Sequence, residues 1–502
     1  MTARSALIAA MSSMRAVMLL MSHFVVVSMA ATHAAATPLG PDDARHLLAR
    51  TGFSPGITEV ADYAQLTREQ AADRLLAGTM QKPVARAPAS VHEFVSPRRI
   101  RAMGDEERRA LLQAEREKGV ELRGWWLQEM LRTPSPLNER MVLFWHNHFV
   151  SSLQKVRSPA LMYRQHLLLR RHALGYFGDL LHDIAKDPAM VVYLDSASNR
   201  KSQPNENFAR EVMELFTLGE GRYSEHDVKE AARAFTGWSI DPDNGEFLFR
   251  LPAHDDGLKT VLGRTGAFDG DAVLDILLAQ PHTAELIVSK LWREFVSPAP
   301  EPAEVARIAR MFRENRYNVK VALRALLVSD AFYATRHRGA LIKSPVDLIV
   351  GTLRQFEFEA ADPTPFVFVL RQLGQDLFAP PNVKGWPGGE AWINSSSLLQ
   401  RKQLLERLFR AQEMRPSPAG METRPVERVA DGKGAGTPRE RLARSLADTY
   451  FDADAWAARL SANEPAMLRL VLAAAPVHAR IASSAASDSL RQLVLDPVYQ
   501  LK

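Results

Sequence analysis

The chain has 502 residues, of which 46% are hydrophobic and 24% charged, with a formal net charge of +5 and no cysteine. This composition is typical of a globular protein with a large core. The lack of cysteine excludes disulfides, thiolate nucleophiles and cysteine-ligated metal sites. Basic and acidic residues are interleaved, without a long basic run flanked by aromatics, so we expect no nucleic-acid binding.

Residues 1–36 are typical of an export signal. Arg4 and Arg15 are their only Lys, Arg, Asp or Glu residues, residues 16–29 are nearly all apolar, and alanines at 34–36 fit a cleavage site. The apolar stretch is shorter than the roughly 20 residues of a membrane span, although a retained anchor stays open as the alternative. Without an arginine pair or a cysteine for lipidation, we expect Sec-type export to the periplasm or the medium, with no integral membrane span after cleavage.

Helical periodicity dominates the rest of the chain. A helix is expected to open at Pro41-Asp42-Asp43 and to close at Gly52, and a second one covers 67–76 with Thr67 as its cap. Residues 81–98 predict a loop, a long helix covers 105–132, and Ser135-Pro136 starts the next one. Further helices are predicted at residues 159–174, 176–186, 206–218, 224–236, 271–278, 281–295, 302–314, 318–329, 344–357, 364–374 and 395–412.

Two segments depart from this pattern. Residues 246–263 contain two β-prone runs around a turn-rich centre, which predicts one hairpin, and 241–245 is interpreted as a turn. Residues 415–438 are rich in proline, glycine and charge, which predicts a flexible linker or a long surface loop. The sequence thus predicts an all-α protein with one small β-hairpin. Its parts are the signal at 1–36, a main helical domain at 37–414, the linker at 415–438, and a C-terminal helical segment at 439–502 that packs on the main domain.

The helix predicted at 206–218 carries a narrow polar stripe of Asn207, Arg210, Glu211 and Glu214, within about 100° of arc. Two carboxylates one turn apart can share acid–base work or hold a metal ion when they are buried. Arg210 can neutralise them or bind an anion. The alternative is an amphipathic helix whose polar face lies in water.

Residues 141–149, MVLFWHNHF, leave no polar helix face wide enough for water, so we expect this helix to be buried. His146 and His148 then enter the interior, where their nitrogens need partners. Each is interpreted either as a core histidine bonded to a carbonyl or as the partner of Glu211 or Glu214. In the second case Glu211, Glu214 and His148 are the candidate ligands of a divalent metal, and the identity of any cofactor stays open.

Two further segments carry candidate substrate-binding residues. His254, Asp255 and Lys259 belong to the HDDGLK segment at the tip of the predicted hairpin, which is also a good turn. Tryptophans on proline-stiffened loops bind sugars or peptides, or they attach a loop to the core. The rigid segment PPNVKGWPGG at 380–389 and its continuation provide four candidates, namely Asn382, Lys384, Trp386 and Trp392.

Common catalytic motifs are missing from the sequence. It contains no nucleophile-elbow GxSxG, no P-loop, no HExxH and no dinucleotide-binding glycine fingerprint. This absence argues against the commonest hydrolase, kinase, metallopeptidase and dehydrogenase designs.

Several long sequence segments, in a fixed order, resemble those of one family. They are HLLARTGF at 46–53, WWLQEMLRTPSPLNERMVLFWHNHF at 125–149, NENFAREVMELFTLGEGRYSEHDVKEAARAFTGW at 205–238, HDDGLKTVLG at 254–263, KLWREFVSP at 290–298, LIKSPVDLIVGTLR at 341–354, and PPNVKGWPGG with WIN at 380–394. Over nearly the whole mature chain, the sequence resembles the bacterial domain of unknown function 1800 family. The resemblance implies an exported, mainly helical protein with another exported protein as a candidate partner. It implies no catalytic role, because the family has no established activity.

Two functions stay open at this point. The first is an acid–base or metal-assisted hydrolase that acts on a cell-envelope or extracellular polymer. The second is a non-catalytic factor that binds a glycan or an exported protein through Trp386, Trp392 and neighbouring loops. A third, structural interpretation makes the stripe around Arg210 a buried ion-pair network that orients helix packing.

Overall fold

Helices form most of the structure, so the all-α class predicted from the periodicity is confirmed. The computed structural model describes residues 37–360, 362–413, 449–460, 463–478 and 485–502. The predicted signal and linker lie outside these residues. The described residues from Leu39 to Lys502 belong to one compact unit.

In the first part of the chain, the long helices begin and end close to the predicted start and stop residues. Gly52 follows the last residue of the first described helix, and Thr67 Oγ1 caps another by accepting from Gln70 N at 3.3 Å. Residues 81–98 are irregular except for a 3₁₀ turn and the start of a short helix. The helices are α2 (Gly40–Thr51), α3 (Ile57–Ala64), α4 (Arg68–Ala77), α5 (Pro97–Ala102), α6 (Asp105–Arg132), α7 (Pro136–His148), α8 (Leu153–Val156), α9 (Pro159–His172), α10 (Phe177–Ala185) and α11 (Pro188–Tyr193).

The helix predicted at 206–218 is divided into an α-helix and a π-helix. Leu218 N donates to Met213 O, five residues earlier, and Thr217 Oγ1 donates to Val212 O. The wider turn changes the direction of the side chains beyond Val212, so the stripe is not a simple α-helical face. The helices from here on are α12 (Asn207–Glu211), the π-helix η3 (Val212–Thr217), α13 (Glu225–Ala234), α14 (Gly270–Ala279), α15 (Pro281–Phe295), α16 (Pro302–Glu314), α17 (Val319–Leu327), α18 (Asp330–Tyr333), α19 (Pro345–Gln355), α20 (Thr364–Gln372), α21 (Ser395–Glu413), α23 (Ala453–Ala458), α24 (Glu464–Val471) and α25 (Ala486–Leu495).

The small β structure consists of two hairpins instead of the single one expected at 246–263. β1 (Trp238–Ile240) pairs antiparallel with β2 (Phe247–Phe249), and β3 (Lys259–Val261) pairs with β4 (Arg264–Gly266). The turn expected at 241–245 closes the first hairpin. Leu262 and Gly263, both with positive φ, close the second. Each β-prone run thus pairs across a tight turn with a nearer neighbour, because a short connection is the easier one to close.

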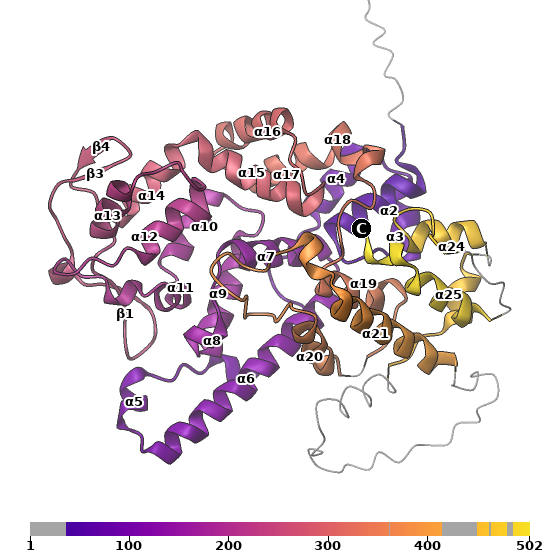
Figure 1. Ribbon diagram of the computed structural model, residues 1–502, viewed down its shortest axis with the longest axis horizontal. Coiled ribbons are helices and arrows are strands. Elements are labelled where there is room, and N and C mark those ends of the chain that lie inside the picture. The colour runs from indigo at the N-terminus through magenta and orange to yellow at the C-terminus, as the bar shows by residue number, and fades with distance from the viewer. Residues whose placement is uncertain (1–36, 361, 414–448, 461–462, 479–484) are drawn as a thin grey trace, which may run out of the picture. The chain divides into compact units, whose positions relative to one another are not determined.

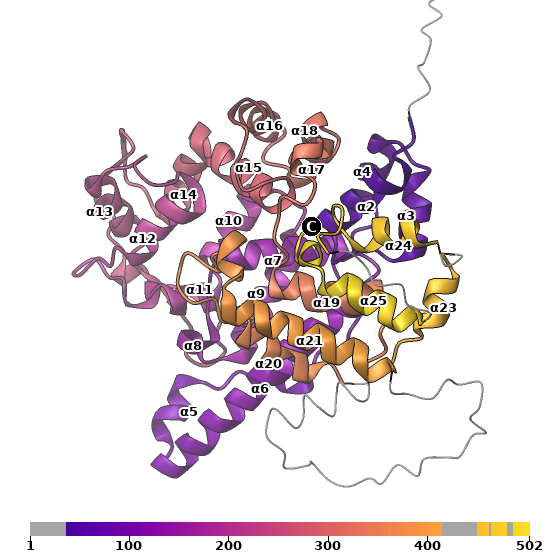
Figure 2. The same cartoon turned by 45° about the vertical axis from the view of Figure 1, so that its right-hand side comes forward.

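Helix α7 lies near the middle of the packed helices in both ribbon views (Figures 1 and 2). It contacts α2, α6 and α9. Met141, Val142 and Trp145 have no exposed surface, which agrees with the expectation of a helix that is apolar on all sides. A buried ionic triad joins its first turns to two neighbours, because Arg170 of α9 pairs with Glu129 of α6 and Glu139 of α7.

The C-terminal helices pack on parts of the chain that are far away in sequence. α25 contacts α21, and α24 contacts α2. Figures 1 and 2 show α21 in orange and α25 in yellow, lying side by side. A β-bridge between Ile342 and Leu501 brings Lys502 next to the start of α19, where its Nζ lies 2.8 Å from Asp347 Oδ2.

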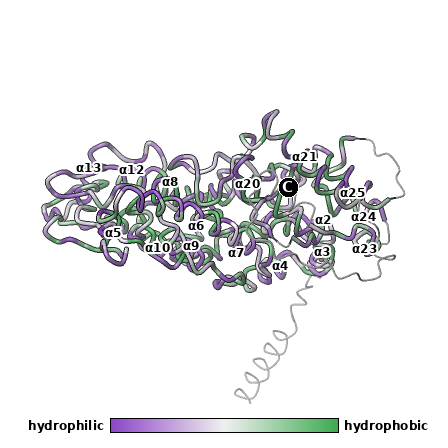
Figure 3. The backbone as a smooth tube through the Cα atoms, turned by 90° about the horizontal axis from the view of Figure 1, so that it is seen from below, coloured by the Kyte–Doolittle hydropathy of each residue, from purple (hydrophilic) through white to green (hydrophobic). Residues whose placement is uncertain are grey.

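Hydrophilic and hydrophobic residues alternate along the described chain (Figure 3). No helix in its described part is both long and apolar enough to cross a lipid bilayer.

The glycine-rich loop at 380–389 is attached to the end of α7 through Asn147. Asn147 Oδ1 accepts a hydrogen bond from Trp386 N at 2.6 Å, and its Nδ2 donates to Trp386 O at 3.5 Å. Gly385 lies beneath this contact with φ of +87°, and a Cβ atom there would be 2.2 Å from Asn147 Oδ1. The close approach of the loop therefore requires glycine at this position.

We predict that Gly385→Ala destabilises the protein by about 2 kcal/mol more than Gly388→Ala. Gly388 also has a positive φ, of +71°, but a Cβ atom there meets nothing within 4 Å. Both positions have a positive φ, and only the first variant adds a clash with Asn147. Urea unfolding of both variants measures the difference, and equal losses would contradict the proposed contact.

Candidate functional site

A cavity of about 590 Å³ lies where α7, α15, the segment 340–347 and the loop 384–392 meet, and we call it the central cavity. Four of the residues singled out in the sequence contribute to its wall, namely His148, Lys384, Trp386 and Trp392. Five cationic and three anionic side chains also line it, which are Arg140, Lys290, Arg293, Lys384, Lys502, Glu294, Asp347 and Glu390.

One part of this charge is paired inside the wall. Arg140 is 1% exposed and hydrogen-bonds to Asp347, Glu294 and the carbonyl of Gly52. Lys502 is the second cation bonded to Asp347. Although burial opposes ionisation, Arg140 and Lys502 hold the pKa of the Asp347 carboxyl well below its usual range. These groups thus form a closed ionic network that is part of the fold.

Lys290 and His148 form a second polar contact at the cavity. Lys290 Nζ lies 2.9 Å from His148 Nδ1 and donates to Leu215 O at 2.9 Å. Burial, together with the neighbouring charge of Lys290, lowers the pKa of His148 far below its ordinary value. The ring is therefore neutral, and Nδ1 accepts the hydrogen bond from the lysine. Burial and the charge of Arg293 lower the pKa of Lys290 to about 8.

Three cations of the cavity lack a carboxylate partner. None of the three, Lys290, Arg293 and Lys384, makes an ion pair with another described residue. Arg293 and Lys384 are exposed, whereas Lys290 is mostly buried. The Trp386 Nε1 group is buried and also has no hydrogen-bond partner within the described part of the chain. The wall thus offers several donors to a ligand and carries an excess of positive charge.

The two carboxylates of the predicted stripe, Glu211 and Glu214, do not line this cavity. Glu214 accepts a hydrogen bond from Tyr223 OH at 2.7 Å, while Glu211 has no hydrogen-bond partner among the described residues. Both are partly buried. Burial and the charge of Glu214 raise the pKa of Glu211, and the charges of Arg210 and Lys384 oppose the shift. Lys384 therefore acts electrostatically on Glu211 and also lines the central cavity.

The other two residues of the stripe are engaged elsewhere. Asn207 Nδ2 donates to Leu194 O at 3.2 Å. Arg210 binds the carboxylate of Glu225 through both terminal nitrogens, each at 2.7 Å, and also pairs with Glu206. The guanidinium thus neutralises neither Glu211 nor Glu214 by direct contact. The ion-pair network expected for the stripe is a partly exposed one and does not contain these two acids.

His146 lies in a different place from His148. Its ring packs 4.8 Å from Trp126, 5.1 Å from Phe378 and 5.8 Å from His166, measured between ring centroids. Neither nitrogen of His146 has a hydrogen-bond partner in the described chain. Burial lowers the pKa of this imidazole to about 3. No hydrogen bond or ion pair joins His146 or His148 to Glu211 or Glu214, so the structure does not produce the expected histidine–carboxylate pair.

The described residues contain no group of three or more histidine, aspartate and glutamate side chains arranged to hold a metal ion. Glu211, Glu214 and His148 therefore do not converge as a set of three ligands.

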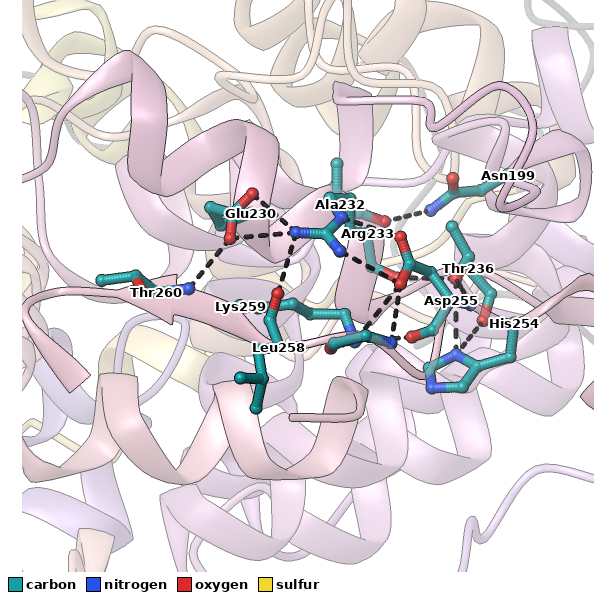
Figure 4. Close-up of polar contacts among 11 residues, drawn as sticks. Asn199, Glu230, Ala232, Arg233, Thr236, His254, Asp255, Leu258, Lys259 and Thr260 are labelled. Atoms are coloured by element: carbon teal, nitrogen blue, oxygen red, sulfur yellow. Dashed lines mark hydrogen bonds and ion pairs between the residues drawn. The ribbon is translucent and has the colours of Figure 1, made fainter. Parts of the chain in front are cut away.

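The HDDGLK residues form an internal polar network, which Figure 4 shows. Asp255 binds Arg233 through both carboxylate oxygens, at 2.7 and 3.1 Å, and His254 Nδ1 lies 2.9 Å from Thr236 O. Lys259 is 1% exposed and donates to the carbonyls of Asp255 and Gly257. These side chains hold the segment between β2 and β3 against α13, and they do not line the central cavity.

The loop residue Asn382 has a structural contact as well. Its Oδ1 accepts from Lys384 N at 2.9 Å and its carbonyl oxygen accepts from Gly385 N at 3.1 Å. The side chain is exposed, and it shapes the turn that presents Lys384.

Sequence reasoning missed Arg140, Lys290, Arg293 and Asp347. A signal was present, because Lys290 and Glu294 lie one turn apart beside Leu291, which is 1% exposed. Charged residues at the border of an apolar helix stripe can face a polar interior. Periodicity alone does not separate them from residues on a solvated face.

The fold and the cavity define an all-α protein with a large, positively charged central cavity. A family model described as "Protein of unknown function (DUF1800)" matches residues 46–501. The chain therefore belongs to this family, as the sequence segments quoted above indicated. No curated protein and no solved structure matches the chain.

The buried His146 predicts a loss of stability in acid. Its folded-state pKa of about 3 lies below the ordinary value of 6.5. As the pH falls below 6.5, the unfolded chain therefore takes up a proton that the folded protein refuses, and stability decreases. When the pH falls from 7 to 5, we expect the free energy of unfolding of His146→Phe to decrease by about 2 kcal/mol less than that of the wild type.

Urea unfolding at both pH values measures this difference. His226→Phe is the control, because it makes the same replacement at a histidine that is exposed on α13. Identical pH dependence in His146→Phe and the wild type would show that His146 is not a buried neutral imidazole.

Proposed function

We propose that the protein binds an anionic ligand in the central cavity. The observation that carries the proposal is the set of cations without carboxylate partners among the described residues, namely Lys290, Arg293 and Lys384. A charge near a low-dielectric wall is stabilised by an opposite charge. Glu294 and Asp347 pair with Arg140 and Lys502, so Glu390 is the one carboxylate of the wall left beside three cations without carboxylate partners in the described chain. An anionic ligand would supply further negative charge.

The other groups of the wall indicate what the ligand contains besides its charge. The nitrogen donors of the three cations suit ligand oxygens, and the rings of Trp386 and Trp392 in the wall add apolar area. A volume of about 590 Å³ accommodates a molecule of one to a few sugar units in size. An acidic sugar fits this combination of charge, oxygen acceptors and apolar faces. Since residues 1–36 predict an export signal, the proposed ligand is an acidic unit of an envelope or extracellular glycan.

The proposal predicts that Lys384→Gln weakens the binding of glucuronate about tenfold, which is about 1.4 kcal/mol. Added salt should weaken binding to the wild type more than to the variant, because one screened charge is missing in the variant. Titration calorimetry at two salt concentrations measures both effects. Lys229→Gln is the matched control, since Lys229 is an exposed lysine on α13 outside the cavity. Unchanged affinity in both Lys384→Gln and Arg293→Gln would refute an anion site here.

A second candidate function is the acid–base hydrolysis of an envelope or extracellular polymer. Glu211 supports it, because this carboxyl is partly buried, has a raised pKa and has no hydrogen-bond partner among the described residues. A carboxyl that keeps its proton closer to neutral pH can act as a general acid. Lys384, which acts on Glu211 and lines the cavity, connects the acid to the proposed binding site.

Under this second proposal, Glu211→Gln lowers the rate of polymer cleavage by about 100-fold or more while glucuronate binding is retained. The wild-type rate should fall as the pH rises through the raised pKa of Glu211, because the protonated acid is lost. Release of reducing ends from acidic polysaccharides measures the rate. Glu220→Gln is the control at an exposed position. If the Glu211 variant cleaves as fast as the wild type, the catalytic proposal fails and the binding proposal is unaffected.

A further inference from the structure

Lys290 has surroundings that differ from those of an ordinary surface lysine. It lies on α15, lines the central cavity, and is mostly buried. Its Nζ contacts two neutral acceptors, the Nδ1 atom of His148 and the carbonyl oxygen of Leu215. No carboxylate among the described residues pairs with it, and Arg293, one turn away, is a like charge. The burial and the like charge of Arg293 disfavour the ammonium form relative to the amine, whereas the two acceptors favour it.

The contact with Leu215 belongs to the end of the π-helix η3, where backbone carbonyls lack partners within the helix. Lys290 therefore also closes that helix end, and a purely structural role is the simplest alternative. This role by itself calls for a permanent cation, which the negative end of the helix dipole favours. The burial and the neighbouring arginine act in the opposite direction, and the pKa of Lys290 is lowered to about 8.

The lowered pKa changes the chemistry available to this side chain. At pH 7.5 about a quarter of Lys290 is the neutral amine, against about a thousandth of an unperturbed lysine. Neutral amines attack carbonyl carbons, and a desolvated lysine next to another cation is a known arrangement for forming Schiff bases. His148 cannot compete for the proton, because its pKa is lowered well below 6.5 whereas that of Lys290 is about 8. It serves as a positioning residue that holds Nζ at the cavity wall.

We infer that Lys290 forms a Schiff base with a carbonyl compound that carries an anionic group. The inference rests on the proposed anion site, which brings such a compound to the lysine. The nitrogen of Lys290 attacks the carbonyl carbon to form a carbon–nitrogen bond. The resulting carbinolamine then loses the former carbonyl oxygen as water, with both hydrogens coming from the amine. Arg293 and Lys384 bind the anionic group, and no oxidant or reductant is needed.

Pyridoxal 5′-phosphate is a suitable probe, since it combines an aldehyde with a phosphate. The full chain is incubated with the probe at pH 7.5, the imine is reduced with borohydride, and the labelled lysines are identified by peptide mass spectrometry. We expect Lys290 to be labelled at least tenfold faster than the exposed Lys229, with a half-maximal rate near pH 8. Glucuronate or inorganic phosphate should slow the labelling of Lys290 and leave Lys229 unaffected.

Lys290→Arg is the decisive variant, because it keeps the positive charge and the contact with the end of η3 but provides no nucleophilic amine. We expect it to lose the fast label. Circular dichroism confirms that it is folded. If the wild type binds glucuronate but labels Lys290 no faster than Lys229, the Schiff-base inference is overturned and the anion site remains. If the wild type neither binds glucuronate nor labels Lys290, both proposals fail.

Discussion

The ion pair between Arg140 and Asp347 is the interaction on which the structure around the central cavity depends. Both side chains are almost completely buried, and a charge buried so deeply is tolerated only beside partners. Those partners come from distant parts of the chain, since Glu294 belongs to α15, Lys502 to the C-terminal end and the Gly52 carbonyl to the residue after α2. Satisfying one guanidinium and one carboxylate thus requires the elements that surround the cavity to meet there.

The network explains why the remaining charges of the cavity are left for other tasks. Asp347 and Glu294 are engaged by Arg140 and Lys502, so they do not neutralise the cations on the rest of the wall. In the HDDGLK segment, too, Asp255 and Lys259 bind other groups of the chain, Arg233 and the Asp255 carbonyl. Asp255 and Lys259 thus hold the fold, while Lys290, Arg293 and Lys384 lack carboxylate partners among the described residues and line the cavity.

Local rules predicted the helices well where the pattern is long and the ends are marked. The helix at 105–132 was predicted with the bounds that the structure shows, because acids begin it and an apolar stretch ends it. These rules failed where backbone hydrogen bonding decides which strands pair and which type of helix forms. Strand β2 pairs with β1 and not with β3, and one wider turn after Glu211 makes the stripe helix a π-helix. Neither event changes the hydrophobic periodicity, so the sequence pattern contains no sign of it.

The sequence by itself determined the all-α class and the burial of α7, since both follow from local periodicity. Only the tertiary structure decided which polar residues act together. It separated His146 from His148, linked His148 to Lys290 and brought Lys384, which lines the cavity, close enough to Glu211 to influence its pKa. The reason is physical: the protonation and pairing of a side chain depend on burial and on charges within a few ångströms, and these neighbours come from helices far apart in sequence.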